Sequence, residues 1–485
     1  MSRNKIIGSL VAISALWLGS TAYIGSNTEA YLKNYVERTN KIYEQYGFKV
    51  SLEAFEKGFF SSKANMNMDF IEPDMREIFS DTFKLPMKMN YNIENGPIFF
   101  EKGLGFGSSR IEQNLQASDY VVEEEAFKKM FKNDIMFNSS MVIGFAGNAS
   151  FTAHSNPIVA DIEGDTLTMS PLKMEGDMDM DTFEGKVKMF VDSLVASQGE
   201  DSLTIKSLLL DADITKFYAN GFYLGDFLFE VDSLSTKGAI LPISLENAKV
   251  SLGMLIDENK DKSIDMKFNI DADTRNSVLP KEYASLKKVA LAYALNGTSL
   301  KGLLAFQDFT KRLEAKQQAL ALKLSSDNGA FDMEALEELE KFQVEAEEEM
   351  MLLLAGLLNK DRTNLTVNMN LLDKQDKESS LNMKVAYVGD EVLPTTSKDL
   401  MEKFTKDFLE LLAVDLNIEL NKDYIANLPV ELQEKLAPQL QMGTMLGVVK
   451  DNNVSYRFDA KYQPKTLMVN GEDRTEMLQM LERGI

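Results

Sequence analysis

Histidine, the side chain most often used for acid–base chemistry near neutral pH, occurs once in the 485 residues, at His154. Any Ser–His–Asp triad would have to use this residue. Its surroundings, residues 151–157 (FTAHSNP), contain no nucleophile-elbow motif. The single histidine also excludes a zinc site built from several histidines, and the absence of cysteine excludes thiolate ligands and thiol nucleophiles. We therefore interpret His154 as an ordinary polar position.

One acidic stretch has the spacing with which a calcium-binding loop begins. Asp177, Asp179 and Asp181 alternate with methionines, which places the three carboxylates on one face of a predicted strand. A calcium loop needs glycine at its sixth position and glutamate at its twelfth, because the chain turns sharply and the glutamate binds the ion with both oxygens. Here those positions hold Thr182 and Lys188. We predict a solvated strand face.

A second acidic stretch fails in the same two places. Asp257, Asn259 and Asp261 are followed by Lys262 at the sixth position and Phe268 at the twelfth. The stretch is rich in turn-forming residues, so a solvent-exposed turn is the favoured interpretation.

The glycine run at residues 103–107 (GLGFG) is not followed by Lys-Ser/Thr and lacks a strand-to-helix setting, so it predicts a loop and not a phosphate site. Paired carboxylates of the glycosidase type remain an alternative, since their separation is a three-dimensional property and 75 acidic residues make chance pairs common. We predict no catalytic, cofactor-binding or metal-binding residues and no cofactor. The favoured class is a non-enzymatic protein, with a carboxylate-based hydrolase as the weaker alternative.

The formal net charge is −23, and the pI is near 4.7. A chain this acidic repels nucleic-acid phosphates, so we predict no nucleic-acid partner. It contains no cysteine, and its fold must therefore be held by an apolar core without disulfides.

Most of the chain alternates apolar and polar residues with a period of two, which is typical of strands with one apolar and one wet face. Polar turn-like clusters at residues 257–261, 373–377 and 451–453 predict hairpins and hence an antiparallel sheet. The alternating stretches are Met66–Phe70, Met87–Ile93, Met174–Met180, Leu203–Leu209, Val250–Leu255, Ile264–Ile270, Leu365–Leu371, Leu381–Tyr387, Val414–Leu420 and Val454–Ala460.

A helical hairpin interrupts this pattern. The predicted helices are Ser299–Leu324 and Asp332–Leu358, joined by a Ser/Asp/Asn/Gly loop at 325–329. The second helix has one apolar stripe and an acidic remainder, whereas membrane-surface helices carry basic polar faces. We therefore expect it to pack on protein, with the sheet as a surface that it can cover. Shorter helices are predicted at Ser397–Leu412 and Asp423–Leu436.

The N-terminus carries an apolar run, Ile6–Ile24, with no charge between Lys5 and Glu29. About 20 helical residues span a hydrocarbon core of about 30 Å, and this run just reaches that length. Arg3 and Lys5 precede it, so the positive-inside rule predicts an inner-membrane, single-pass anchor with the bulk of the chain in the periplasm. The alternative is a signal peptide cleaved after Ala22.

Together these patterns predict an α+β fold: an N-terminal transmembrane helix followed by a large, extended antiparallel β-sheet with a helical hairpin insertion. The predicted divisions are 1–27 for the anchor, 28–298 for an N-terminal helix (Thr28–Tyr46) and sheet, 299–358 for the hairpin, and 359–485 for a β/α region that completes the sheet.

Four stretches support a family resemblance: the anchor with the helix that follows it, residues 52–62 (LEAFEKGFFSS), residues 93–98 (IENGPI), and the C-terminal end from 442 through 451–453 to 469–471. In this order they resemble the YdgA-like family of Gram-negative envelope proteins, whose function is unknown. The family's His-Gly-Pro turn has Asn95 here in place of histidine. The resemblance implies a location and an architecture, and no functional residue is carried over.

The leading hypothesis is a membrane-anchored periplasmic protein whose amphipathic sheet binds a lipid or an envelope protein partner. The inner membrane would be a partner through the N-terminal helix. The alternative is a homo-oligomeric envelope scaffold that associates through strand edges without a ligand.

Overall fold

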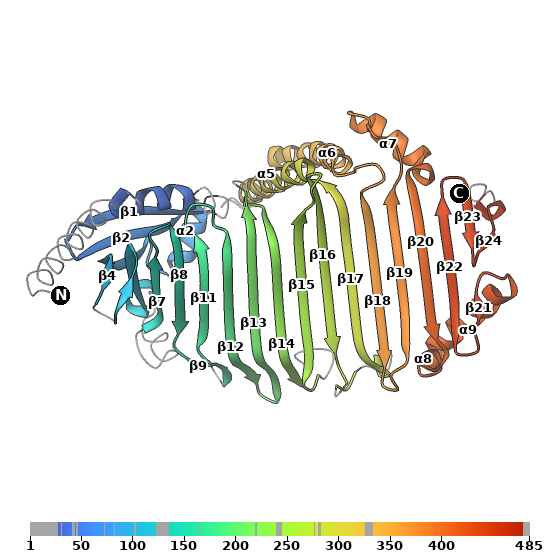
Figure 1. The fold of residues 1–485 in the computed structure, drawn as a ribbon, viewed down its shortest axis with the longest axis horizontal. Helices are drawn as coiled ribbons and strands as arrows, with labels where there is room; N and C mark the ends of the chain where they lie inside the picture. Colours follow the sequence, from blue (N-terminus) through green and yellow to red (C-terminus); the bar gives the residue numbers. More distant parts are fainter. Residues whose placement is uncertain are drawn as a thin grey trace, which may run out of the picture. The chain divides into compact units, whose positions relative to one another are not determined.

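A computed structural model describes residues 28–30, 32–40, 44, 47–71, 73–81, 83–100, 103–122, 135–162, 164–218, 221–238, 245–275, 277–279, 283–324 and 333–478. The chain forms two compact units. The first contains residues 1–232 and 236–240, and the second contains 233–235 and 241–485. Each unit is built mainly from antiparallel strands (Figure 1).

The first unit begins with a helix at 28–30 and 32–40. Its sheet runs in the order β1-β2-β3-β6-β7-β8-β11-β12-β13, and the β9–β10 hairpin pairs with the part of β12 that lies beyond β11. The elements are β1 (Phe48–Glu56), β2 (Ser61–Phe70), α2 (Pro73–Ser80), β3 (Met87–Asn95), β4 (Ile98–Phe99), β5 (Gly105–Phe106), β6 (Ser109–Gln116), α3 (Ala117–Tyr120), β7 (Ile135–Ile143), β8 (Asn148–Ser155), β9 (Ile158–Ile162), β10 (Asp165–Met169), β11 (Leu172–Asp179), β12 (Gly185–Gln198), β13 (Asp201–Phe217) and β14 (Tyr223–Lys237), which continues into the second unit.

The core of the first unit forms where the helix at 28–40 packs on β1, β2 and β3. Leu32 and Val36 are four residues apart, so they lie on one face of the helix. They join a buried cluster with alternate residues of the three strands, because alternate strand positions point to the same side of the sheet. The strand members of the cluster are Val50, Ala64, Met66 and Ile93.

The second unit is a meander in which each long strand pairs with the next, in the order β15-β16-β17-β18-β19-β20-β22. A long helical insertion, α5 and α6, separates β17 from β18. The elements are β15 (Ala248–Glu258), β16 (Ser263–Asp273), β17 (Leu286–Ser299), α5 (Leu300–Leu324), α6 (Met333–Gly356), β18 (Asn364–Asp373), β19 (Glu378–Tyr387), α7 (Ser397–Lys406), η3 (Phe408–Leu411), β20 (Leu412–Asn421), α8 (Lys422–Ala426), α9 (Val430–Met445), β21 (Lys450–Asp451), β22 (Ser455–Gln463), β23 (Thr466–Val469) and β24 (Glu472–Asp473).

The free edge of β22 is covered by two very short strands. β21 pairs with Tyr456 and Arg457, while β23 pairs with residues 460–463, so both lie on the edge opposite β20. Short edge strands offer little backbone for pairing with another chain, which is a common protection against sheet extension.

Buried side chains of this sheet lie at the ends of its strands. At the end where α5 and α6 emerge, Ile264, Thr298 and Tyr387 are buried, and at the opposite end Leu286 and Asp373 are buried. The middles of the strands contribute no residue to the buried core of the described chain. The sheet is therefore closed at its two ends and open along its centre.

The predicted fold class is wrong. The described residues are mainly in strands, so the protein is mostly β and not α+β, with the helices forming local insertions and end caps. The described residues also contain no helix long and apolar enough to cross a membrane. Seven charged residues interrupt α5, and nine lie along α6, which explains why neither helix could cross a membrane. The anchor predicted at 1–27, with its possible cleavage after Ala22, lies outside the described residues. The prediction of an antiparallel sheet is confirmed.

Candidate functional site

Three rows of apolar side chains cross the seven long strands of the second unit. The antiparallel register places one residue from each strand in each row, and alternate residues along a strand put all three rows on one side of the sheet. We call this surface the central apolar face. Its rows are Leu252, Ile270, Leu291, Met369, Leu381, Ile418 and Phe458; Met254, Phe268, Tyr293, Val367, Met383, Leu416 and Ala460; and Ile256, Met266, Leu295, Leu365, Val385, Val414 and Tyr462.

None of these side chains is buried by the described residues. Most are half-buried by their own neighbours in the sheet, and Tyr293 and Leu365 are 42% and 37% exposed. Phe268 and Tyr293 lie side by side on the neighbouring strands β16 and β17, with ring centroids 4.9 Å apart. Soluble proteins rarely leave a contiguous apolar surface of this kind uncovered unless it binds something.

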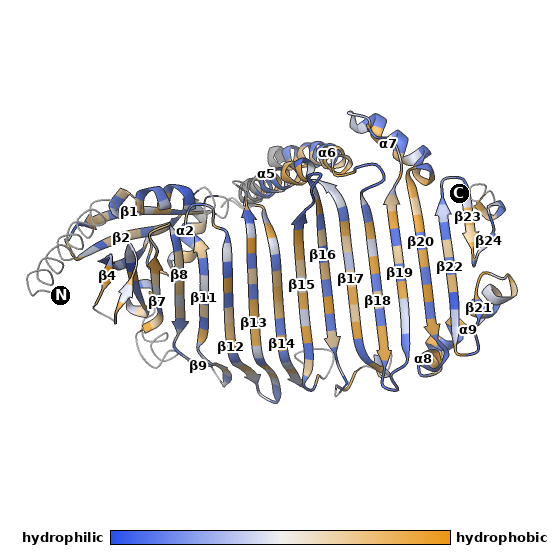
Figure 2. Ribbon diagram, in the orientation of Figure 1, coloured by the Kyte–Doolittle hydropathy of each residue, from blue (hydrophilic) through white to orange (hydrophobic). Residues whose placement is uncertain are grey.

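The opposite side of the same strands is polar. Asn368, Asn382 and Asn417 are in register on neighbouring strands, and charged residues flank them. Figure 2 shows the consequence as alternating hydrophobic and hydrophilic bands along β15 to β22. Antiparallel sheets commonly have one face in water and one face packed on a core, so the apolar side is the one that needs a covering.

One end of the central apolar face is fixed by the base of the helical hairpin. The backbone N–H of Ser299 donates to the carbonyl oxygen of Leu357 at 3.1 Å. The side-chain amide of Asn359 donates to the carbonyl oxygen of Gly297 at 2.7 Å. These bonds hold the start of α5 against the end of α6, and α5 and α6 lie over this end of the sheet (Figure 1).

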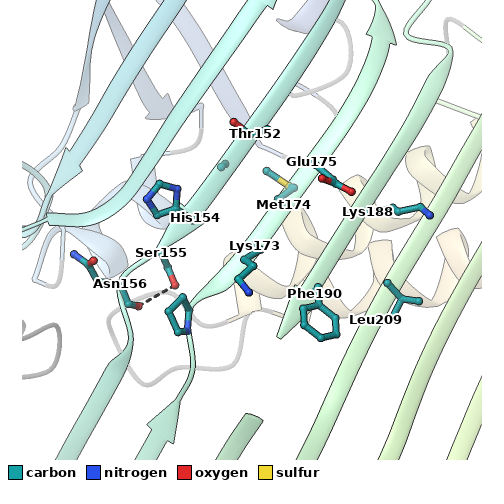
Figure 3. A pocket seen from close by; sticks show the side chains of 12 residues that line it. Thr152, His154, Ser155, Asn156, Lys173, Met174, Glu175, Lys188, Phe190 and Leu209 are labelled. Carbon is teal, nitrogen blue, oxygen red and sulfur yellow. Dashed lines mark hydrogen bonds between the residues drawn. The ribbon is translucent and has the colours of Figure 1, made fainter. Parts of the chain in front are cut away.

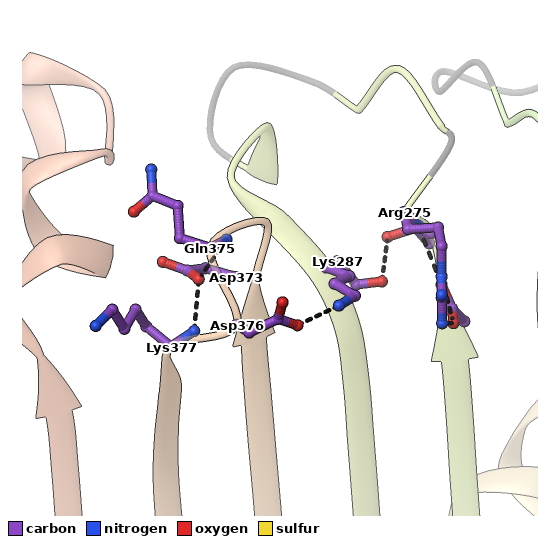
Figure 4. Close-up of polar contacts among 8 residues, drawn as sticks. Arg275, Lys287, Asp373, Gln375, Asp376 and Lys377 are labelled. Carbon is purple, nitrogen blue, oxygen red and sulfur yellow. Dashed lines mark hydrogen bonds and ion pairs between the residues drawn. The ribbon is translucent and has the colours of Figure 1, made fainter.

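The other end is closed by the β16–β17 and β18–β19 turns (Figure 4). Asp373 is buried, and one of its carboxylate oxygens accepts hydrogen bonds from the backbone N–H groups of Gln375 and Lys377 at 2.8 and 2.7 Å. Lys287 forms an ion pair with Asp376, which joins the two turns. The polar groups at this end therefore stabilise the turns through hydrogen bonds and an ion pair.

Beside this end, Arg275 holds Asp273 with its side chain. The guanidinium Nε lies 2.9 and 3.0 Å from the two carboxylate oxygens. These hydrogen bonds lower the pKa of Asp273 below its ordinary value.

His154 lies on the exposed side of β8 in the first unit. It contributes to a depression of about 720 Å³ on the polar side of β8, β11, β12 and β13 (Figure 3). The Ser155 hydroxyl donates to the carbonyl oxygen of Asn156 at 2.9 Å. Two lysines that line the depression pair with aspartates: Lys173 with Asp192 at 3.5 Å, and Lys188 with Asp211 at 3.1 Å. The depression therefore offers balanced surface charges.

The first acidic stretch forms a turn. The Asp179 carboxylate accepts hydrogen bonds from the backbone N–H groups of Asp181 and Thr182 at 2.8 and 2.9 Å, and these bonds lower the pKa of Asp179. Asp181 pairs with Arg38, and Asp177 accepts a hydrogen bond from the Ser150 hydroxyl at 2.5 Å. The three carboxylates are separately engaged.

The second acidic stretch also forms a turn. Asp261 accepts hydrogen bonds from the backbone N–H and hydroxyl of Ser263 at 3.0 and 2.7 Å, and these bonds lower the pKa of Asp261. Arg362 contacts its other carboxylate oxygen at 2.6 Å. Within the part of the chain that the structure describes, no group of three or more His, Cys, Asp or Glu residues is arranged to hold a metal ion.

Two of the stretches that carry the family resemblance meet at Asn95. Its side-chain amide donates to the carbonyl oxygens of Gly58 and Phe59 at 3.1 and 3.3 Å, and it lies 3.2 Å from the Ser62 hydroxyl oxygen. Asn95 and Ser62 are both 2% exposed. The position is structural here: the amide links the β1–β2 turn to the end of β3.

The glycine run at 103–107 is a turn with a packing role. Gly105 pairs with Phe99, and a Cβ at Gly105 would lie 2.4 Å from the guanidinium of Arg110. That guanidinium lies 4.9 Å from the centroid of the buried Phe99 ring and pairs with Glu94 at 3.4 Å. A side chain at Gly105 would therefore displace the Arg110 guanidinium from this position.

Comparison with known proteins places the chain among bacterial sequences. Residues 4–476 match the family described as "bacterial protein of unknown function (DUF945)". The chain is also 20% identical over 512 residues to the uncharacterised protein YihF of Escherichia coli (strain K12), an alignment that covers 98% of each chain. No solved structure matches the chain.

Proposed function

Because the chain belongs to the DUF945 family of bacterial proteins of unknown function, we propose a role from the site itself: the central apolar face binds the acyl chains of a lipid and catalyses no reaction. The observation that carries this proposal is the set of three in-register apolar rows that remain unburied. The earlier resemblance to YdgA-like proteins is compatible with membership of this family.

The chemistry of the face favours an apolar ligand over a protein partner. Backbone N–H and C=O groups in the strand interior are paired with neighbouring strands, so they cannot bind a ligand. The hydroxyl of Tyr462 already donates a hydrogen bond to the carbonyl oxygen of Leu409 at 2.6 Å. Protein interfaces carry about one hydrogen bond per 100–200 Å². A surface of aliphatic and aromatic side chains with so few donors and acceptors suits hydrocarbon chains better.

The dimensions of the face fit acyl chains. Neighbouring strands lie about 4.8 Å apart, so seven strands span about 29 Å. A bilayer core about 30 Å thick contains two layers of acyl chains, which makes one chain about 15 Å long. The face is therefore long enough for acyl chains laid across the strands.

Methionines make the face adaptable. Met254, Met266, Met369 and Met383 stand in the rows on four different strands. Their unbranched, polarizable side chains adjust to ligands of variable shape at little cost. This favours binding of a class of lipids over recognition of one rigid molecule.

A charge placed in the middle of the face tests the proposal. Met383→Lys puts an ammonium group in the central row, whereas Asn382→Lys puts the same group on the opposite, polar side of the same strand. The full chain is purified from cells, extracted with organic solvent and analysed by mass spectrometry for bound lipid. We expect lipid with the unaltered protein and with Asn382→Lys, and little with Met383→Lys, because an unpaired charge is costly among acyl chains.

Circular dichroism spectra of the two variants must match, so that lost binding is not lost folding. Recovery of no lipid from the unaltered chain would overturn the proposal, and so would equal lipid recovery from both lysine variants. We further propose that the protein works in the cell envelope, as the composition of residues 1–24 suggests. Protease protection in intact and permeabilised cells tests that location.

A further inference from the structure

Three turns at one end of the first unit carry large exposed apolar side chains. They are the β1–β2 turn at 57–60, the β3–β6 connection with described residues 96–100 and 103–108, and the β7–β8 turn at 144–147. We call them the aromatic turns. The exposed side chains are Phe59 (44%), Phe60 (52%), Phe100 (60%), Leu104 (71%), Phe106 (65%) and Phe145 (67%).

Hydrogen bonds connect the three aromatic turns to one another at this end of the sheet. The Asn95 side chain bonds the first turn to the start of the second, and the Asn95 backbone N–H donates to the carbonyl oxygen of Phe60 at 2.7 Å. Ser108 joins the second turn to the third: its backbone N–H donates to the carbonyl oxygen of Ile143 at 2.7 Å, and its hydroxyl lies 3.3 Å from the carbonyl oxygen of Gly144. Neighbouring turns thus lie side by side along the edge.

The polar side chains nearest these turns are paired and mostly buried, so contact with lipid would cost them little. Arg110 and Glu94 pair at 3.4 Å, with side chains 10% and 13% exposed, and the backbone N–H of Phe100 donates to Glu94 at 2.6 Å. Lys57 is the single charged residue among the described positions of the turns. Glu101 and Lys102, outside the described residues, add one charge of each sign.

We propose that the aromatic turns insert into the interfacial layer of a phospholipid bilayer. Aromatic side chains favour that layer, where an apolar ring meets water and head groups. The three turns lie beyond the ends of their strands with their apolar side chains exposed, and a deformable bilayer can fit such a surface. A protein partner would need a matching surface. This inference rests on the first unit alone and does not depend on lipid binding by the second.

Position-specific quenching tests the insertion. Trp17 is the chain's one tryptophan, so Trp17→Phe provides a silent background for single tryptophans placed by Phe60→Trp, Phe106→Trp or Phe145→Trp. Matched controls are Ile71→Trp and Val122→Trp, at positions that are 47% and 48% exposed. Ile71 follows the other end of β2, and Val122 follows α3, beyond the other end of β6. Each full-length variant is mixed with phosphatidylethanolamine–phosphatidylglycerol vesicles, with or without bromine on the acyl chains.

We expect brominated vesicles to quench tryptophans at 60, 106 and 145, with a blue shift of their emission, and to leave those at 71 and 122 unchanged. Because the readout is the depth of each position, it is independent of what else attaches the chain to the vesicle. Equal quenching at tips and controls, or no quenching at the tips, would overturn the inference.

Discussion

The side-chain amide of Asn95 lies 3.2 Å from the Ser62 hydroxyl oxygen and also donates to the carbonyl oxygens of Gly58 and Phe59. We predict that Asn95→Ala lowers the free energy of unfolding of the first unit by about 1–3 kcal/mol, because buried acceptors lose their donor. Asn95→Asp should cost more at neutral pH, since a carboxylate would face two carbonyl oxygens. Urea unfolding measures both.

Asn90→Ala is the control for these variants, because Asn90 is an exposed residue of the same strand. It should change stability by no more than about 0.5 kcal/mol. If Asn90→Ala and Asn95→Ala unfold at the same urea concentration, the proposed role of the Asn95 bonds is wrong.

Two isoleucines of the second unit allow the buried core to be compared with the central apolar face. Ile264 is fully buried at a strand end, and Ile418 lies in a row of the central apolar face. Ile264→Ala should lower the free energy of unfolding by about 2–5 kcal/mol. Ile418→Ala should cost clearly less in the lipid-free protein, because its side chain is not enclosed. Chemical unfolding of delipidated samples compares them, and equal losses would mean that the face is a packed core.

The hairpin base contains a matched pair of glycines. A Cβ at Gly302 would lie 2.4 Å from the carbonyl oxygen of Gly356, whereas a Cβ at Gly356 would meet nothing within 4 Å. Gly302→Ala should therefore destabilise the base of the hairpin by about 1–3 kcal/mol. Gly356→Ala should be tolerated. Limited proteolysis of the α5–α6 segment reports the difference, and equal cleavage rates for the two variants would contradict it.

Tyr120 should make the first unit sensitive to alkaline pH. Burial, helped by the neighbouring Asp119 charge, raises the pKa of Tyr120 to about 12, and its hydroxyl donates to the carbonyl oxygen of Lys88 at 2.6 Å. A raised pKa means that the neutral form is favoured in the folded chain. Its stabilising contribution is full below the ordinary pKa of 10.0 and is lost as the pH rises towards about 12.

Tyr120→Phe removes that titration together with the hydrogen bond. The unaltered protein should be more stable than Tyr120→Phe at pH 8, and the gap should narrow as the pH rises from 10 towards 12. Differences between the two proteins cancel the titration of the other tyrosines. A gap that stays constant over this range would refute the assignment.

The alternating stretches were predictable because a half-exposed strand shows its period directly. Residues 87–93 lie in β3, and residues 365–371 lie in β18. β17 was not predicted, because its polar-side positions in mid-strand are Ala290, Ala292 and Ala294, so the contrast between its faces disappears. The same limit applies to β12, where Phe190 and Val191 place apolar residues on both sides of the strand.

The candidate site was only partly predictable. The period indicates that one side of each strand is apolar, but it does not give the register that aligns Val367 with Met383 and Leu416. It also cannot show whether the helical hairpin would bury these side chains, since that depends on tertiary packing. The link from Asn95 to Ser62 depends on contacts across 33 residues and has no local signal. The α+β prediction is wrong because the helical insertion, although long, does not divide the sheet: β17 and β18, on either side of it in the sequence, pair with each other.

The row arrangement gives evolution a simple way to change how much hydrocarbon the central apolar face can bind. Every strand adds one side chain to each row, so the width of the face is set by the number of strands and not by the shape of a closed cavity. A relative with one additional hairpin would have a face wider by about 10 Å, with both ends built as before. Selection could thus match the face to longer or more numerous hydrocarbon chains by whole hairpins, without redesigning the residues already in place.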